Sequence, residues 1–325
     1  PEYDFFEARQ ENEFVDGKAW LPVKQEFIYK SKSGRTKSSG RTVAIYDHYK
    51  IDTQFAKKYF NREISSTTLE AYKKDSTFWN IVRKEPLNEN EVKFIIKNDS
   101  IYRATHSQQY LDSVDHRRNK ITAIKLLFLG QENYKRSKER TIAIDPVISM
   151  YRPLMPGGAR INLAGDYFKI FESKKFIVIN ANVSYGFLNH DFKGSATVTH
   201  RYNPFSNGYV TVSAGRDFDF IYTGDAYINL FRRSNFYIKN NFELGHGVEL
   251  FNGFILRNKI EFAERQSLGN LKLSRKFDTL FTYNNEPIKF EPYNTFYIST
   301  TIEYTPFSMY IREPRQKIVL GSKFP

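Results

Sequence analysis

The sequence predicts a mainly β fold with a smaller α/β part at the N-terminus. The C-terminal half is expected to form an antiparallel transmembrane β-barrel, incomplete in this chain, preceded by a periplasmic segment. Two observations lead to this prediction. Long segments after residue 140 alternate between apolar and polar side chains, and the connections between them are alternately short and long. Barrel strands alternate between lipid and lumen, with short periplasmic turns and longer outside loops.

The alternation is clearest within residues 175–187, 235–250 and 253–265. Successive side chains of a strand point to opposite faces, so each segment has one apolar and one polar face. A tilted strand needs about nine to eleven residues to cross a bilayer, and these segments are long enough. The residues expected to face lipid are Ile177, Ile179, Val183, Phe242, Leu244, Leu256 and Ile260. The residues expected to face the lumen are Asn180, Asn182, Lys239, Glu243, Glu249, Arg257, Lys259 and Glu261.

The same pattern gives the expected order of strands. Strands are predicted at 141–150, 159–171, 174–187, 191–203, 208–216, 235–250, 253–265, 294–305 and 316–324. Two long connections, 217–234 and 266–293, then fall at the same end of the strands. If the N-terminal part is periplasmic, the first of these strands runs outward and both long loops lie outside.

Three regions follow from this assignment. Residues 1–51 are expected to be the end of a soluble periplasmic β domain, with strands at 19–30 and 41–51. Residues 52–140 are expected to be a periplasmic segment of helices and loops. Residues 141–325 are expected to be the N-terminal part of an outer-membrane β-barrel.

Three helices are predicted between the two β regions. Asp75 precedes an apolar run that begins at Phe78, which indicates a capped helix start. Asn88 and Glu91 have the spacing of a capping box for a second helix. A third, weaker helix lies within 111–129.

The chain begins without Met and ends within a predicted strand, so we expect an internal fragment whose open sheet has an unpaired edge near 317–324.

Composition narrows the partners and the chemistry. The 325 residues carry a net charge of +13, spread almost evenly along the chain, whereas nucleic-acid binders concentrate basic residues on one face. We therefore expect no nucleic-acid partner. The chain has no Cys, which excludes disulfides and thiolate metal sites. Its 22 Tyr and 29 Phe suit the aromatic girdles of barrels, although soluble β proteins are also rich in aromatic residues.

No enzyme, cofactor or metal site is predicted. The sequence lacks the zinc-protease, phosphate-loop and nucleophile-elbow motifs. His190 and His200 lie at opposite ends of one predicted strand, and the glycines beside His246 are expected to relieve crowding. The carboxylates of the lumen-facing set are interleaved with Lys and Arg, which indicates a charged ladder between strands.

Several stretches resemble one known family. Residues 75–91, with Phe78-Trp79, an Arg and Pro86-Leu87 in order, together with 144–151, 249–253 and 317–325, resemble bacteroidete outer-membrane proteins of unknown function. The resemblance runs from about residue 15 to the end. It implies a carboxypeptidase-like regulatory β-sandwich, absent from this chain and not a peptidase, then an uncharacterised region, then a barrel similar to the surface-antigen barrels of BamA and TamA. No segment resembles the tandem periplasmic domains of assembly factors.

The expected protein lies in the outer membrane of a Gram-negative bacterium, with its N-terminal part periplasmic. By this resemblance it would serve envelope biogenesis, transport or attachment, with outer-membrane lipid and other envelope proteins as partners. Two alternatives stay open. One is a soluble, secreted β-rich binding protein whose polar faces meet solvent. The other is a surface glycan-active enzyme with its carboxylates in a groove. In a soluble sandwich the apolar face must meet a second sheet, whereas in a barrel it meets lipid.

Overall fold

A computed structural model describes residues 3–34, 36–57, 59, 61–223, 232–275, 278 and 285–322. The chain forms two compact units. Unit 1 comprises residues 1–61 and 72–88, and unit 2 comprises residues 62–71 and 89–325. The region 52–140, predicted to consist of helices and loops, is therefore shared between both units.

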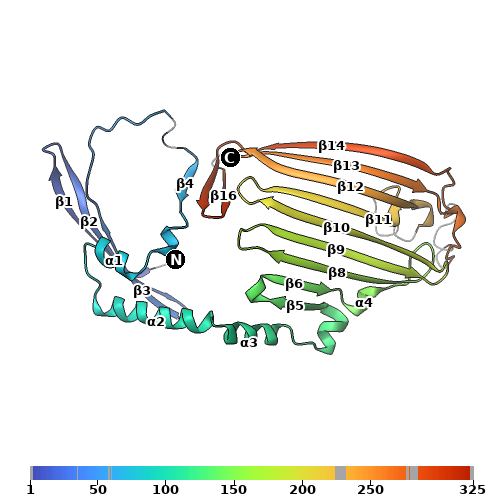
Figure 1. Cartoon of the computed structure of the whole chain (residues 1–325), viewed down its shortest axis with the longest axis horizontal. Helices are drawn as coiled ribbons and strands as arrows, with labels where there is room; N and C mark the ends of the chain where they lie inside the picture. The colour runs from blue at the N-terminus through green and yellow to red at the C-terminus, as the bar shows by residue number, and fades with distance from the viewer. Residues whose placement is uncertain are drawn as a thin grey trace. The chain divides into compact units, whose positions relative to one another are not determined.

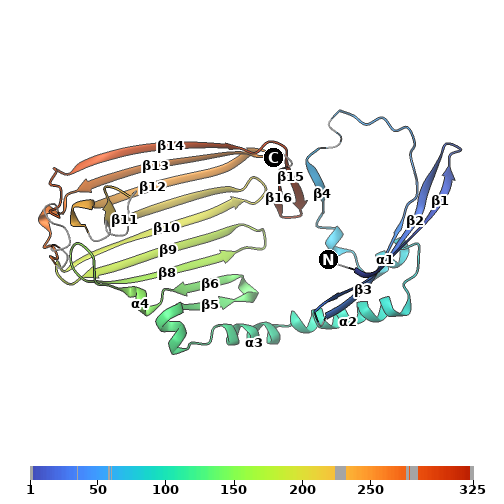
Figure 2. The ribbon, with the colours of Figure 1, turned by 180° about the vertical axis from the view of Figure 1, so that it is seen from behind.

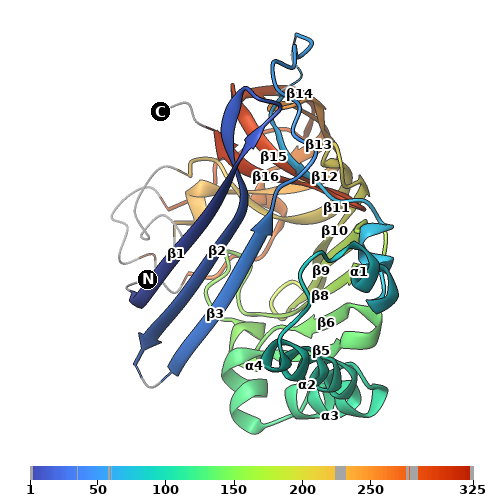
Figure 3. The same ribbon diagram turned by 90° about the vertical axis from the view of Figure 1, so that its left-hand side faces the viewer.

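Unit 1 is built on a three-stranded antiparallel sheet in the order β1-β2-β3, seen side by side in Figure 3. The strands are β1 (Tyr3–Val15), β2 (Ala19–Ser33) and β3 (Thr36–Ile45). The predicted strand at 19–30 corresponds to β2. The strand predicted at 41–51 is shifted toward the N-terminus, because β3 continues the hairpin ladder with β2 from Thr36 onward. β1 was not predicted.

Helix α1 (Ser76–Val82) and the loop after it belong to the same unit. The predicted cap is confirmed, since Asp75 Oδ1 accepts a hydrogen bond of 3.0 Å from the Phe78 amide. Beyond the helix, the Glu85 carboxylate pairs with Lys24 Nζ at 2.6 Å and with Arg41 Nη2 at 2.5 Å. These bonds join the loop to β2 and β3. Together they lower the pKa of Glu85, the hydrogen bond from Lys24 most of all.

The helices of unit 2 are α2 (Glu89–Thr105), α3 (Gln108–Arg118) and a four-residue α4 (Val147–Met150). The third predicted helix is shorter than expected and is followed by a separate π-helical turn at Lys125–Leu129. Asn119 explains the break. Its side chain donates to the Tyr134 carbonyl and accepts from the Tyr134 amide, both at 2.7 Å, which ties the end of α3 to β5.

The main body of unit 2 is a ten-stranded sheet in the order β14-β13-β12-β11-β10-β9-β8-β6-β5, with the short β7 also paired to β8 (Figure 1). Every pairing in it is antiparallel. Its strands are β5 (Gln131–Lys135), β6 (Arg140–Ile144), β7 (Tyr151–Arg152), β8 (Arg160–Ile170), β9 (Phe176–Gly186), β10 (Asp191–Asn203), β11 (Gly208–Phe220), β12 (Phe236–Phe251), β13 (Phe254–Gln266) and β14 (Tyr293–Tyr304). From β8 to β14 the predicted strands are confirmed to within a few residues.

Two predicted strands are wrong in extent or in pairing. The strand expected at 141–150 stops at Ile144, because Pro146 has no amide for a ladder and instead precedes α4. The strand expected at 316–324 is β16 (Gln316–Ser322), whose predicted end lies outside the described residues. It pairs with β15 (Ser308–Glu313), and β15 pairs in parallel with β4 (Glu63–Ser66). The free edge near the C-terminus is therefore β14.

The connections of the large sheet lie at two ends, as Figure 1 shows. The turn end carries the short connections 171–175, 204–207, 252–253 and 305–307, and the loop end carries 187–190, 221–235 and 267–292. The prediction that both long connections share one end is confirmed for the strand ends that they join, while residues 224–231, 276–277 and 279–284 within them lie outside the described residues. Across the described residues the sheet does not close on itself, since β14 and β5 are its two edges.

The apolar core is small and lies at the loop end. Phe236, Ile238 and Leu268 are buried there. Phe218, Phe220, Leu271 and Leu273 are packed against them and are partly buried. Elsewhere the large sheet keeps many apolar side chains exposed, so most of its apolar surface contributes nothing to a protein core.

Candidate functional site: two faces of the sheet and its loop end

Cross-strand register divides the large sheet into two faces. Residues directly opposite in an antiparallel pair lie on the same face. One row of such partners crosses eight strands and is apolar or aromatic throughout: Ile142, Tyr167, Ile179, Val198, Val212, Leu244, Ile260 and Ile298. A second row on this face is Ile144, Gly165, Ala181, Ala196, Ala214, Phe242, Phe262 and Phe296. We call this the apolar face.

The opposite surface is the polar face. The row between the two apolar rows contains Ala143, Asp166, Asn180, Thr197, Ser213, Glu243, Glu261 and Tyr297. Because parity separates the faces, the seven residues predicted to face lipid share the apolar face, and the eight predicted to face a lumen share the polar face. Phe242 and Val183 are 49% and 47% exposed. That these faces meet lipid and lumen water stays a prediction.

Ion pairs connect neighbouring strands on the polar face. Lys239 Nζ lies 3.0 Å from Glu261 Oε2, and Lys259 Nζ lies 2.6 Å from Glu243 Oε2, both between β12 and β13. Arg257 Nη1 pairs with Glu303 on β14 at 2.6 Å. The predicted charged ladder is therefore present. Glu243 and Glu261 lie directly opposite each other, but each is engaged by a lysine, which suits a charge-balanced wall better than an acid–base pair.

Midway along β8 to β11, most side chains of the polar face are uncharged. Ser195 Oγ donates to Asn182 Oδ1 at 2.6 Å, and Thr197 Oγ1 donates to Ser213 Oγ at 2.9 Å. Asn180 Nδ2 donates to Asp166 Oδ1 at 2.5 Å. Such cross-strand pairs satisfy the side chains of a polar surface without any apolar covering layer.

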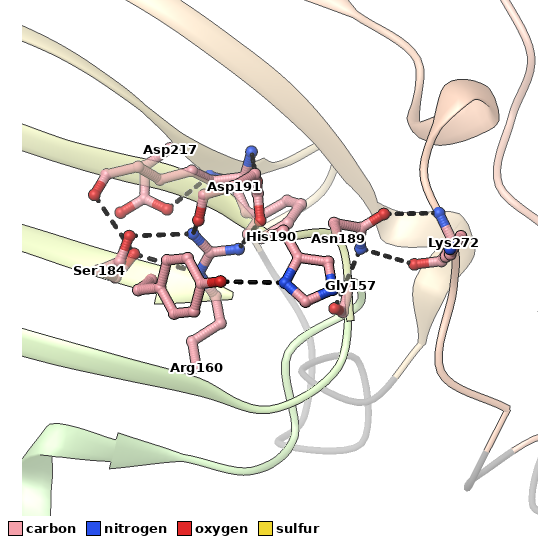
Figure 4. A network of polar contacts seen from close by, with 11 residues as sticks. Gly157, Arg160, Ser184, Asn189, His190, Asp191, Asp217 and Lys272 are labelled. Atoms are coloured by element: carbon pink, nitrogen blue, oxygen red, sulfur yellow. Dashed lines mark hydrogen bonds and ion pairs between the residues drawn. The ribbon is translucent and has the colours of Figure 1, made fainter. Parts of the chain in front are cut away.

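A buried charged cluster lies where the polar face reaches the loop end (Figure 4). The side chains of Arg160 and Lys193 are each 1% exposed, and both pair with Asp191, at 2.7 and 2.8 Å. Arg160 also donates to the Ser184 hydroxyl and carbonyl, each at 3.1 Å. Gly186 provides space for the Arg160 side chain, because a Cβ at position 186 would lie 2.3 Å from Arg160 Nη1.

Sequence reasoning missed this cluster. Asp191 and Lys193 are two residues apart in a predicted strand, so the sequence does predict that their side chains lie on the same face. The partnership with Arg160 depends on how β8, β9 and β10 are aligned, and no local pattern carries that information.

Three connections of the loop end are tied together beside this cluster, as Figure 4 shows for Asn189. Asn189 Nδ2 donates to the Gly157 carbonyl at 3.2 Å and to the Lys272 carbonyl at 2.8 Å. The Lys272 amide donates back to Asn189 Oδ1 at 2.8 Å. The Ser274 amide also bonds the Pro156 carbonyl at 2.9 Å. The connection after β13 thus reaches the connections that flank β8 and β9.

Glu249 behaves differently from the other predicted lumen residues. It lies at the turn end, where its Oε1 binds Lys317 Nζ of β16 at 2.6 Å and accepts from the Gly253 amide at 2.7 Å. The predicted face is the same, but the partner comes from a hairpin outside the large sheet.

The three histidines of the large sheet and its loops each contact a tyrosine hydroxyl or a backbone carbonyl. His246 Nε2 bonds the Tyr202 hydroxyl at 2.8 Å, His190 Nδ1 bonds the Tyr185 hydroxyl at 2.9 Å, and His200 Nδ1 lies 3.1 Å from the Phe176 carbonyl. Among the described residues, no three His, Asp or Glu side chains are grouped to hold a metal ion. None of the helices in that part of the chain combines the length and hydrophobicity needed to cross a bilayer.

Comparison with known proteins gives one match. The family model described as "Family of unknown function (DUF5686) C-terminal domain" matches residues 124–325, which include the whole ten-stranded sheet. No curated protein and no solved structure matches the chain.

Proposed function

We propose that the large sheet of this chain, which belongs to the family of unknown function DUF5686 through its C-terminal domain, is part of the wall of an outer-membrane β-barrel. In this proposal the apolar face meets lipid and the polar face lines a lumen. The protein acts in envelope biogenesis, transport or attachment without catalysis, as the resemblance to surface-antigen barrels suggests. Its partners are outer-membrane lipid and other envelope proteins.

The single observation that carries the proposal is the uncovered apolar face. Two adjacent rows on this face are apolar or aromatic across eight strands, and no other described element of unit 2 packs over them as a second layer. A soluble sandwich would bury such a face against another sheet. The strands β8 to β14 have 11 to 16 residues, and about nine to eleven are enough to cross a bilayer.

Aromatic side chains at both ends of the apolar face add support. At the turn end the rings of Phe251 and Phe254 stack with their centroids 4.6 Å apart, and both rings lie near Tyr304. At the loop end the ring centroids of Tyr185 and Phe192 are 5.0 Å apart. Barrels carry such aromatic residues in girdles at the two membrane interfaces, with aliphatic residues between them.

The proposal also predicts which ends of the strands are periplasmic, and it requires pairing partners for the two edge strands of the sheet. Short connections suit the periplasmic side and the long connections 221–235 and 267–292 suit the outside, so the part before the sheet is periplasmic. Unpaired backbone groups are costly in lipid, so β5 and β14 must each be paired by a further strand in the membrane.

Flotation with lipid vesicles tests the proposal. The full-length protein, in which this proposal has further strands pairing β5 and β14, is folded from urea in the presence of vesicles. Its flotation with the vesicles and its resistance to carbonate extraction and to protease are compared with those of a sample folded without lipid. The proposal predicts that the sheet is protected only in vesicles or detergent. A monomeric protein that is fully folded and soluble without either would support the secreted binding protein instead.

A further inference from the structure

The β15–β16 hairpin crosses the turn end of the large sheet. It follows β14, yet it pairs with β4 and not with any strand of the large sheet. Figures 1 and 2 both show it running across the ends of the long strands. At its tip, Arg315 Nη1 donates to the Glu172 carbonyl at 2.7 Å, in the turn between β8 and β9. The hairpin therefore reaches from one edge of the sheet to strands near the other.

One buried ion pair holds the hairpin against the sheet. Lys317 Nζ lies 2.6 Å from Glu249 Oε1, and the two side chains are 11% and 4% exposed. The same ammonium group lies 4.7 Å from the centre of the Tyr310 ring. On the other strand of the hairpin, Asn252 Nδ2 donates to the Ser308 carbonyl at 2.6 Å. Strand β12 and the turn after it thus contact both strands of the hairpin.

The contact is polar and incompletely satisfied. Among the described residues, Glu249 Oε2, Asn252 Oδ1 and Ser308 Oγ are buried without a hydrogen-bond partner. Glu249 and Asn252 line a cavity of about 240 Å³ between the hairpin and the sheet. Buried polar groups without partners destabilise a contact, so this interface depends heavily on the few bonds that it makes.

We propose that β15–β16 is a gate over the turn end of the polar face, latched by the Lys317–Glu249 pair. The proposal rests on the barrel proposed above, because a gate needs a lumen to close. When the pair is broken, the hairpin swings away about the 305–307 turn together with β4, which stays paired to β15, while the large sheet stays folded. A solute entering from the turn side then reaches the polar face.

Thiol labelling tests the gate without requiring transport, and the chain has no native Cys to interfere. Ser308 is the first residue of β15 and is 1% exposed at the contact with Asn252, so Ser308→Cys reports on opening. Ser184→Cys is the matched control, since Ser184 is 3% exposed on the polar face at the loop end. Each is combined with Lys317→Gln, Glu249→Gln or the conservative Lys317→Arg, and labelled with a water-soluble maleimide in detergent.

The gate predicts that Lys317→Gln and Glu249→Gln each speed labelling at position 308 by at least about tenfold, because loss of one partner leaves the other buried and unpaired. The double variant should be no faster than the faster single variant, and Lys317→Arg should stay slow. Labelling at position 184 should not change. Unchanged labelling at position 308, or an equal rise at position 184, would overturn the gate. Neither result bears on vesicle insertion, so the barrel proposal is tested separately.

Discussion

Leu244 on β12 lies directly opposite Ile260 on β13, in a row of apolar and aromatic side chains that crosses eight strands. One residue earlier, Glu243 lies opposite Glu261, and both carboxylates pair with lysines. The two faces thus differ sharply at adjacent positions of the same strand.

The first prediction concerns depth in the membrane. In the full-length protein, Leu244→Arg should cost about 2–4 kcal/mol of folding free energy in vesicles, because its side chain would enter lipid near the midplane. Leu250→Arg, near the turn end of the same strand, should cost about 1 kcal/mol or less. Glu243→Arg should also cost about 1 kcal/mol or less, since it breaks only a partly exposed pair with Lys259.

Urea titration of folding into vesicles measures all three variants. Equal penalties at positions 244 and 250 would count against lipid contact. Ile238, another apolar residue of β12, is unsuitable as a shallow position, because it is buried against Phe236 and Leu268.

The second prediction concerns the buried cluster at the loop end. Asp191→Asn should destabilise the sheet by about 3–5 kcal/mol, because two buried cations lose their counter-charge. Adding Lys193→Met should recover part of that loss. Asp166→Asn, at an exposed position of the same face, should change stability by about 0.5 kcal/mol or less. Chemical unfolding in detergent measures all three, and equal effects at positions 191 and 166 would refute the importance of burial.

The third prediction concerns two glycines on one face of β12. A Cβ at Gly247 would lie 2.3 Å from the Tyr209 ring, whereas a Cβ at Gly245 would meet nothing closer than 3.5 Å. Gly247→Ala should therefore cost about 1–3 kcal/mol through displacement of the ring. Gly245→Ala should be neutral or slightly stabilising. Thermal unfolding of the two variants separates these outcomes, and matching losses would show that the Tyr209 contact is unimportant.

The fourth prediction concerns pH and unit 1. Hydrogen bonds from Lys24 and Arg41 hold the pKa of Glu85 below its ordinary value of about 4.5. A carboxyl with a lowered pKa stabilises the fold above its ordinary pKa, and that contribution is lost as pH falls through the lower value. Unit 1 should therefore lose stability as the solution is acidified below about pH 4.5.

Both Trp residues, Trp20 and Trp79, lie in unit 1, so intrinsic fluorescence follows its unfolding. Glu85→Gln should lower the melting temperature at neutral pH and flatten the acid dependence. Asp47, whose pKa is lowered mainly by Lys84, keeps a residual slope. An unchanged pH profile in Glu85→Gln would contradict the role of this ion pair.

The strands from β8 to β14 could be predicted because each face has one kind of environment along its length. Apolar and polar side chains then alternate with a period of two along the whole strand, as they do in 176–186 and 254–266. The strand at β16 was predicted, but its pairing with β15 and that of β15 with β4 could not be, because β15 is short and β4 lies far away in the sequence. The partners of Arg160 and Glu249 depend likewise on long-range alignment. At Pro146 the alternation continued past a residue that cannot join a ladder, and there the strand was extended wrongly.

Site-directed fluorescence with lipid quenchers tests the central claim most directly. Single cysteines are introduced at Val212, Ser213, Glu243 and Leu244 of the full-length protein and labelled with a small fluorophore. The protein is then folded into vesicles with nitroxide-labelled lipids. The barrel wall predicts strong quenching at positions 212 and 244 and weak quenching at 213 and 243, because these neighbours lie on opposite faces. Equal quenching at all four positions, or none at 212 and 244, would contradict it.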